Sequence, residues 1–87
     1  MSEPYAPISC ALHDYLEIAC QFGYRLQIEL SDGRHLHAQA LDTETAASKE
    51  EFLIVVDDHG ARLRVRLDHL RAITPLTPDA RFHTVRF

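Results

Sequence analysis

Cys10 and Cys20, together with the adjacent His13–Asp14 pair, are the residues of this 87-residue chain that come closest to a thiol nucleophile with its base. Neighbouring residues on a helix point about 100° apart, which is poor geometry for a His–Asp relay. The sequence also has no glycine-rich phosphate loop and no nucleophile elbow. We therefore expect no catalytic residues and no enzyme, with a small thiol or metal-dependent enzyme as the alternative.

The spacing of Cys10 and Cys20 bears on their redox state. If both lie on one helix, a rise of ~1.5 Å per residue separates them by about 15 Å, whereas a disulfide needs Cα atoms within ~7 Å. If Cys10 precedes the helix, that argument does not apply. We expect two free thiols in a reducing compartment.

His35 and His37 lie in a segment with strand-like alternation, so both rings face the same side. Such a pair could begin a zinc site that His59, His69 or a carboxylate completes. The simpler interpretation is that both face solvent, because they alternate with apolar residues. No compact motif supplies a third or fourth ligand, so we expect no metal and no cofactor.

Arg62, Arg64 and Arg66 alternate along one predicted strand and would share one face of it. Such a stripe could contact the phosphates of a nucleic acid. Because Asp57 and Asp58 come at the end of the adjoining strand, we favour a solvated ladder of cross-strand ion pairs.

Asp14, Glu17 and Gln21 fall on one face of a predicted helix, at steps of three and four. Glu3 could approach this face if the N-terminal arm folds back. Carboxylates held on a rigid helix can dock onto a basic surface that normally receives nucleic acid. The alternative, favoured on these residues alone, is an ordinary solvated face of an amphipathic helix.

The helix that carries this face is predicted over residues 12–22, where apolar residues recur at steps of three and four. Ser9 is a candidate N-cap, and Gly23 is placed to end the helix. Asp14, near the first turn, would suit the helix dipole. Residues 1–11 form an irregular arm because two prolines disfavour helix there. The predicted apolar stripe consists of Leu12, Tyr15, Leu16, Ala19 and Phe22.

After the helix the apolar period changes to two, which predicts a meander of about five short strands. Asp32-Gly33 is a hairpin turn, residues 43–50 a polar loop, and residues 75–87 a tail or an edge strand. This order is typical of an all-β fold with an N-terminal α-helix, a small Sm-like (SH3-type) antiparallel barrel. An OB-fold fits less well, since its helix usually interrupts the strands. We expect a single domain over residues 1–87, with the barrel at residues 24–74.

Charge is distributed unevenly along the chain. Residues 1–60 carry eleven acids and three bases, which gives −8, whereas residues 61–87 carry six arginines and two acids, which gives +4. This charge distribution argues against general nucleic-acid binding and fits a partner whose surface carries charge of one sign.

No apolar run approaches the ~18 residues of a membrane span, and the N-terminus has no secretory pattern. We expect a cytoplasmic protein that is monomeric when free and has no membrane partner.

Residues 5–20 resemble the start of the Rho-binding antiterminator (Rof) family. The family pattern is Tyr-x-Pro-Ile-x-Cys followed by Asp-x-Leu-Glu-(Leu or Ile)-Ala-Cys, and the chain fills each of these positions. The similarity continues more loosely through residues 26–41, 51–56 and 67–68. It spans nearly the whole chain, with its specific part in residues 5–20.

The resemblance implies an Sm-like barrel and binding to the termination factor Rho at its primary RNA-binding site. RNA could then not load, and termination would be reduced. Asp14 and Glu17 match the acidic helix positions of the family, so we expect them to make the contact. His13, Gln21 and Glu3 are expected to assist.

The loop before Phe52, with Lys49 and Glu50, lies where family members also approach Rho. Here the chain departs from the family, whose loop is more basic. We therefore expect the helix to contribute more to the contact with Rho than the loop does. No direct contact with nucleic acid is expected. The alternative is an Sm-like protein that binds single-stranded RNA.

Overall fold

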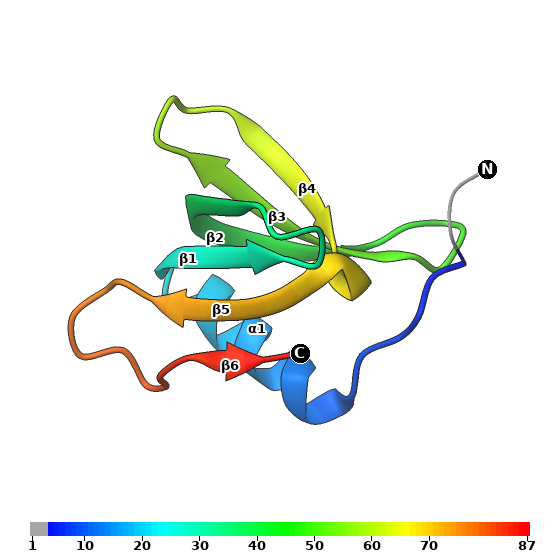
Figure 1. Ribbon diagram of the computed structural model, residues 1–87, viewed down its shortest axis with the longest axis horizontal. Coiled ribbons are helices and arrows are strands. Elements are labelled where there is room, and N and C mark those ends of the chain that lie inside the picture. The colour runs from blue at the N-terminus through cyan, green and yellow to red at the C-terminus, as the bar shows by residue number, and fades with distance from the viewer. Residues whose placement is uncertain (1–3) are drawn as a thin grey trace.

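The computed structural model describes residues 4–87, in which one α-helix precedes six β-strands and one short 3-10 helix (Figure 1). All strand pairs are antiparallel. No helix within these residues is long and apolar enough to cross a membrane. In chain order the elements are α1 (Cys10–Gln21), β1 (Arg25–Leu30), β2 (His35–Thr45), β3 (Glu51–Asp57), β4 (Arg62–Arg66), η1 (Leu67–His69), β5 (Leu70–Pro75) and β6 (Val85–Arg86).

Helix α1 begins two residues earlier than predicted, at Cys10, and the Ser9 side chain caps it by accepting a hydrogen bond from the backbone N–H of Leu12 at 3.3 Å. At the other end Gly23 adopts a φ of +61°, the left-handed conformation that glycine favours. The N–H groups of Gly23 and Tyr24 then donate to the carbonyls of Cys20 and Ala19. These two bonds form a Schellman motif, which fixes where the helix ends.

The apolar stripe of α1 is narrower than predicted. Leu16 and Ala19 are fully buried, but Tyr15 is 37% exposed and Phe22 is 45% exposed. The helix lies across β2 and turns only its central positions toward the sheet, so these two rings lie at its flank. The dipole argument for Asp14 is also wrong, because the earlier start makes it the fifth residue of the helix, beyond the first turn.

Strand β2 is longer than the sequence predicted. Its last residues, Thr43–Thr45, pair with Leu53, Phe52 and Glu51, so the connecting loop covers only residues 46–50 instead of 43–50. Polar residues extend the strand because one side of this sheet faces water, and threonine suits extended backbone. The pairing register shifts at a β-bulge between Ala40 and Asp42.

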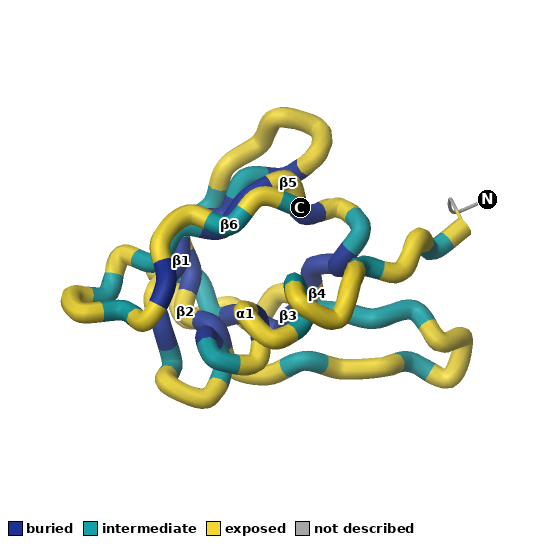
Figure 2. The backbone as a smooth tube through the Cα atoms, turned by 90° about the horizontal axis from the view of Figure 1, so that it is seen from below, coloured by how far each residue is buried: buried dark blue, intermediate teal, exposed yellow. Residues whose placement is uncertain are grey.

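The strand order is β4-β3-β2-β1-β5-β6, and the sheet curls around the core with α1 on its inner side (Figures 1 and 2). Among the described residues, β4 and β6 do not pair with each other. The predicted class, an all-β fold with an N-terminal helix, is confirmed, although the sheet is a barrel only in a loose sense because it stays open.

The C-terminal segment is part of the fold rather than a loose tail. Val85 and Arg86 form β6 and pair with Ile73 and Ala72 of β5. The ring of Phe82 is only 8% exposed and joins the core cluster. The other fully buried side chains at its centre are Leu16, Leu26, Ile28, Leu53, Val55, Leu67 and Ile73.

Candidate acidic partner-binding surface

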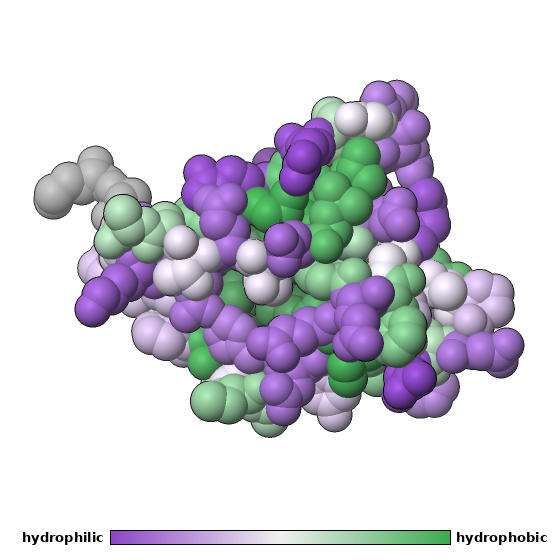
Figure 3. All heavy atoms as spheres, turned by 180° about the vertical axis from the view of Figure 1, so that it is seen from behind, coloured by the Kyte–Doolittle hydropathy of each residue, from purple (hydrophilic) through white to green (hydrophobic). Residues whose placement is uncertain are grey.

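Asp14, Glu17 and Gln21 are exposed on one face of α1, at helical positions that share a side. Neither carboxylate has an ion-pair or side-chain hydrogen-bond partner within residues 4–87. Figure 3 shows the side of the molecule seen from behind Figure 1, where hydrophilic residues form a band across the lower half. Two negative charges are therefore presented to solvent on a rigid element.

His13 lies beside this face and anchors it to the sheet. Its Nε2 is 2.5 Å from a carboxylate oxygen of Glu51, the first residue of β3, and both side chains are about a quarter exposed. This contact brings the N-terminal half of α1 next to the loop at residues 46–50. The helix is thus linked, through Glu51, to the strand that follows the loop.

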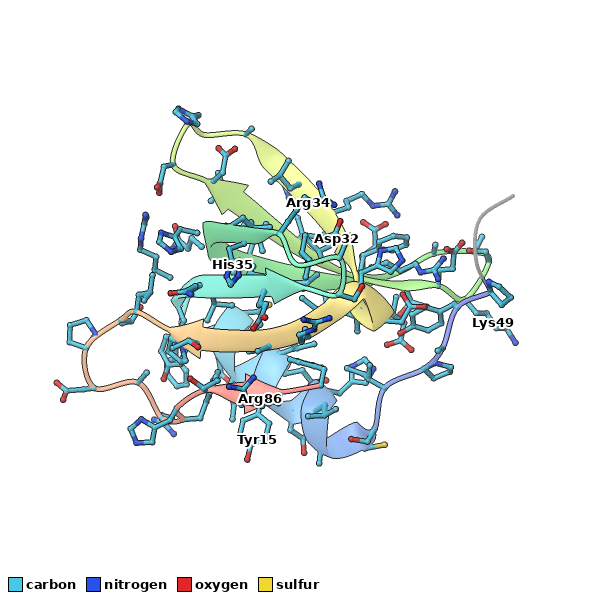
Figure 4. The ribbon with its side chains drawn as sticks, viewed as in Figure 1. Tyr15, Asp32, Arg34, His35, Lys49 and Arg86 are labelled. Carbon is cyan, nitrogen blue, oxygen red and sulfur yellow. The ribbon has the colours of Figure 1, made fainter. Side chains whose placement is uncertain are left out.

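The loop itself is a tight turn. Lys49 has a φ of +71° and its N–H donates to the carbonyl of Ala46 at 2.8 Å. Its side chain extends from the end of the loop into solvent (Figure 4). Glu50 instead contacts its own chain, because its carboxylate accepts hydrogen bonds from Arg66 at 3.0 Å and from the Ser48 hydroxyl at 2.9 Å.

Arg66 is the central residue of a partly buried polar cluster. Its guanidinium is only 6% exposed and donates two hydrogen bonds to the Asp68 carboxylate, at 2.6 and 2.7 Å. It also donates to the carbonyl of Pro4 at 3.2 Å. Asp68 in turn accepts from the N–H of Ala6 at 3.0 Å. The N-terminal arm is therefore tied to η1 beside the loop at residues 46–50.

Hydrogen bonding within this pair changes both pKa values. The side-chain hydrogen bond with Arg66 is the largest cause that lowers the pKa of Asp68, and burial opposes it. The same hydrogen bond raises the pKa of Arg66 further above its already high value. Both groups are ionised at neutral pH, so the cluster is a fixed ion pair and not a proton donor or acceptor.

The predicted ladder between the arginine stripe and Asp57 and Asp58 is wrong. Asp57 accepts the N–H groups of His59 and Ala61 in the β3–β4 turn, and Asp58 pairs with Arg25. The strand register is the reason, since it sets Arg62, Arg64 and Arg66 opposite Val56, Ile54 and Phe52.

The acids that neutralise the stripe come from elsewhere in the chain. Arg64 pairs with Glu44 of β2 at 2.7 Å and lies over the ring of Phe52, with 4.1 Å to its centroid. Arg66 forms ion pairs with Glu50 and Asp68. The stripe is therefore not an evenly solvated row of cations, and its last member is buried.

The histidines and cysteines show no metal or catalytic constellation in the part of the chain that the structure describes. His35 and His37 are exposed, and residues 4–87 contain no group of three or more potential ligands close enough to hold a metal ion. Cys10 and Cys20 are free and both lie on α1. Burial, with smaller contributions from Asp42 and Glu17, raises the pKa of Cys20 to about 11, so this thiol is a poor nucleophile.

Two features of the site were not predicted. One is the Arg66–Asp68 cluster, which the distant residues Pro4, Ala6 and Glu50 join. The other is the exposed pair Leu41 and Asp42, for which the break in alternation after Ala40 was a usable signal of a bulge. Glu3, which was predicted to assist, lies outside the described residues.

The structure defines the chain as a small domain with a curled antiparallel sheet, an N-terminal helix and an exposed acidic face. The chain matches the model of the family described as "Modulator of Rho-dependent transcription termination (ROF)" over residues 7–87. It therefore belongs to this family, as the N-terminal motif indicated.

Relatives of known sequence and structure agree with this assignment. The chain is 36% identical over 74 residues to "Protein rof" of Escherichia coli (strain K12), which covers 85% of this chain and 86% of the relative. The Shigella flexneri protein of the same name gives the same values. The solved structure "YaeO bound to Magnesium from Vibrio cholerae O395" superposes with a TM-score of 0.77 at 23% identity, covering 85% of this chain and 95% of that one. The fold is thus shared with that protein.

Proposed function

We propose that this protein binds Rho and blocks its primary RNA-binding site, and that the acidic face of α1 makes the main contact. The observation that carries the proposal is the exposure of Asp14 and Glu17 without a cationic partner within residues 4–87. Membership in a family that modulates Rho-dependent termination names the partner. The protein acts as a competitor and needs neither chemistry nor a cofactor.

Charge complementarity supplies the physical basis. A surface that loads RNA must attract phosphates and is therefore electropositive. Carboxylates directed at such a surface gain long-range steering and charge-assisted hydrogen bonds. The bulk of the curled sheet then excludes RNA from the occupied site. Because the family acts on transcription termination, we place the protein in the cytoplasm. We also propose that it is a monomer when it is not bound to Rho.

The preorganisation of α1 favours the proposal. The Ser9 cap, the Schellman motif at Gly23 and the His13–Glu51 contact hold both ends of the helix. Asp14 and Glu17 are therefore presented with little conformational entropy left to lose on binding. Gln21 extends the same face toward the C-terminus of the helix.

The N-terminal arm and the loop are proposed as secondary contacts. Lys49 is exposed at the tip of the loop and is available to an acidic residue of Rho. Glu50 contributes mainly by keeping the loop beside Arg66. Glu3 immediately precedes Pro4 in the sequence and is proposed as a further contact of the arm.

Direct binding of single-stranded RNA is the competing proposal, and the arginine stripe is its only support in sequence. Arg64 and Arg66 are both paired with carboxylates of the same chain, so that within residues 4–87 only Arg62 of the stripe keeps an unpaired charge for phosphates.

A pull-down experiment distinguishes binding to Rho from direct binding of single-stranded RNA. The tagged chain is incubated with Rho in the presence and absence of oligo-cytidine RNA, and RNA binding by the chain alone is measured by filter retention. We expect Rho to be captured, RNA to reduce the capture, and the chain alone to retain no RNA. Retention of RNA without Rho, combined with no capture of Rho, would contradict the proposal.

A further inference from the structure

A shallow hollow of about 390 Å³ lies between α1 and β2, next to the acidic helix face. The helix contributes side chains from the flank that borders this face, and β2 contributes side chains from its bulged segment. The lining residues are Glu17, Cys20, Gln21, Leu41, Asp42 and Thr43. Only Glu17 and Gln21 of these belong to the surface already proposed for Rho.

The β-bulge brings Leu41 and Asp42 to the same outer side of β2. Ala38 and Ala40 alternate toward the core and are buried, so regular alternation turns Leu41 outward, where it is 37% exposed at the rim of the hollow. The register then shifts, and Asp42, which would otherwise point inward, is exposed beside Leu41. A leucine beside a charged face gives a partner an apolar surface on which to pack.

Two carboxylates flank this leucine. Asp42 is exposed, and its Oδ1 accepts the N–H of Thr43 at 2.8 Å, which fixes the orientation of the carboxylate. Glu17 and Asp42 line the same hollow, together with Cys20. Neither has a cation partner within residues 4–87. The hollow therefore combines an apolar side with two uncompensated negative charges.

We propose that this hollow receives an arginine side chain of Rho, and that Leu41 and Asp42 form the second half of the interface that α1 begins. The inference rests on the proposed function. The aliphatic stem of the arginine packs on Leu41, and its guanidinium donates to Glu17 and Asp42. Arginine fits better than lysine because its planar group can donate to two carboxylates at once.

Single substitutions in purified full-length protein test this inference through the affinity for Rho. Leu41→Ala and Asp42→Asn are each expected to weaken binding by about tenfold, since both residues are proposed to contact a central anchor of the interface. Asn retains an oxygen that can accept the Thr43 N–H, so the local turn is preserved. The matched controls are Leu76→Ala and Asp79→Asn, because Leu76 is 42% exposed and Asp79 has a φ of +59° that asparagine tolerates. Both controls are expected to bind as the unmodified protein does.

A second measurement uses the unmodified protein and does not depend on any variant. Bound Rho is expected to slow alkylation of the half-buried Cys20 at least several-fold, as followed by peptide mapping. Binding of Leu41→Ala and Asp42→Asn at the affinity of the controls, or unchanged alkylation of Cys20 in the complex, would overturn the inference while leaving Rho binding intact. Failure of the unmodified protein to bind Rho would instead remove the proposed function itself.

Discussion

Arg66 joins four segments of the chain through one guanidinium: the N-terminal arm, the loop at residues 46–50, strand β4 and η1. An arginine this buried is stable only when its charge is paired and its donors are used. The bidentate contact with Asp68 meets that requirement, and the arm is fixed as a result. The arm is held by this cluster and by the packing of Tyr5 and Ile8 against the core.

We predict that Asp68→Asn lowers the melting temperature by on the order of 10 °C at pH 7, because it removes the bidentate partner of the buried Arg66 and leaves its charge paired with Glu50 alone among the carboxylates described. The folded-state pKa of Asp68 is depressed, so its contribution is fully present above the ordinary carboxyl pKa of about 3.9 and is lost as pH falls through the folded value. The difference from the unmodified protein should therefore shrink at pH values below about 4.

Asp58→Asn is the control for this experiment. Asp58 pairs with Arg25, but both side chains are about half exposed, so breaking the pair should shift the melting temperature little. Thermal melts from pH 7 to pH 3 measure both variants. A constant difference for Asp68→Asn across that range would show that its charge does not stabilise the fold.

At the scale of the element, Gly23 connects α1 to β1 and determines the direction in which the acidic face points. A Cβ at this position would lie 3.0 Å from Nε2 of Gln39, which donates to the Gly23 carbonyl at 3.2 Å. The left-handed φ adds a steric cost for any other residue.

We predict that Gly23→Ala destabilises the protein by about 1–2 kcal/mol through backbone strain, with a further loss because Gln39 must move. Gly60→Ala is the matched comparison, since Gly60 also has a positive φ, +81°, but no atom within 4 Å of the added Cβ. Urea denaturation compares the two variants. Equal losses would mean that the Gln39 contact contributes nothing.

The period of the sequence predicted these elements well because local patterns determine them. The Ser9 cap and Gly23 fixed the ends of α1 to within two residues, and Asp32-Gly33 marked the β1–β2 turn. The features that were not predicted depend on contacts between residues far apart in the sequence. Arg66 donates to the Pro4 carbonyl and to the Glu50 carboxylate as well as to the nearby Asp68, and no short-range pattern brings residues 4 and 50 to residue 66. The open edge of the sheet likewise depends on the curl of the whole sheet.

The candidate site was predictable only in its helical part. Asp14, Glu17 and Gln21 follow from helical spacing, and all three are exposed. Leu41 and Asp42 reach the same surface through a bulge, which changes the side on which residues point. Regular strand periodicity predicts that Asp42 points inward, and only the break in alternation after Ala40 marks the change.

At the scale of the whole molecule, the separation of charge between residues 1–60 and residues 61–87 predicts how binding responds to salt. With −8 on the segment that carries α1, attraction to Rho should be screened as ionic strength rises. We expect the affinity to fall by on the order of tenfold or more from low to high salt, as measured by titration of labelled protein with Rho. An affinity that stays constant over that range would remove the electrostatic part of the account.

The acidic face of α1 is the centre of the account, and reversing its charge is the most direct test. Asp14→Lys combined with Glu17→Lys is compared with Asp58→Lys combined with Asp79→Lys, which changes the net charge by the same +4 at exposed positions off the helix. The helix variant should fold, because exposed helix charges alter stability by only a few tenths of a kcal/mol each. Thermal melts check that the control also folds, since Asp58 pairs with Arg25 and Asp79 has a φ of +59°. The affinity of each for Rho is measured under one set of conditions. We predict a loss of about a hundredfold or more for the helix variant and a much smaller loss for the control. A folded helix variant that binds Rho as tightly as the control would contradict the account.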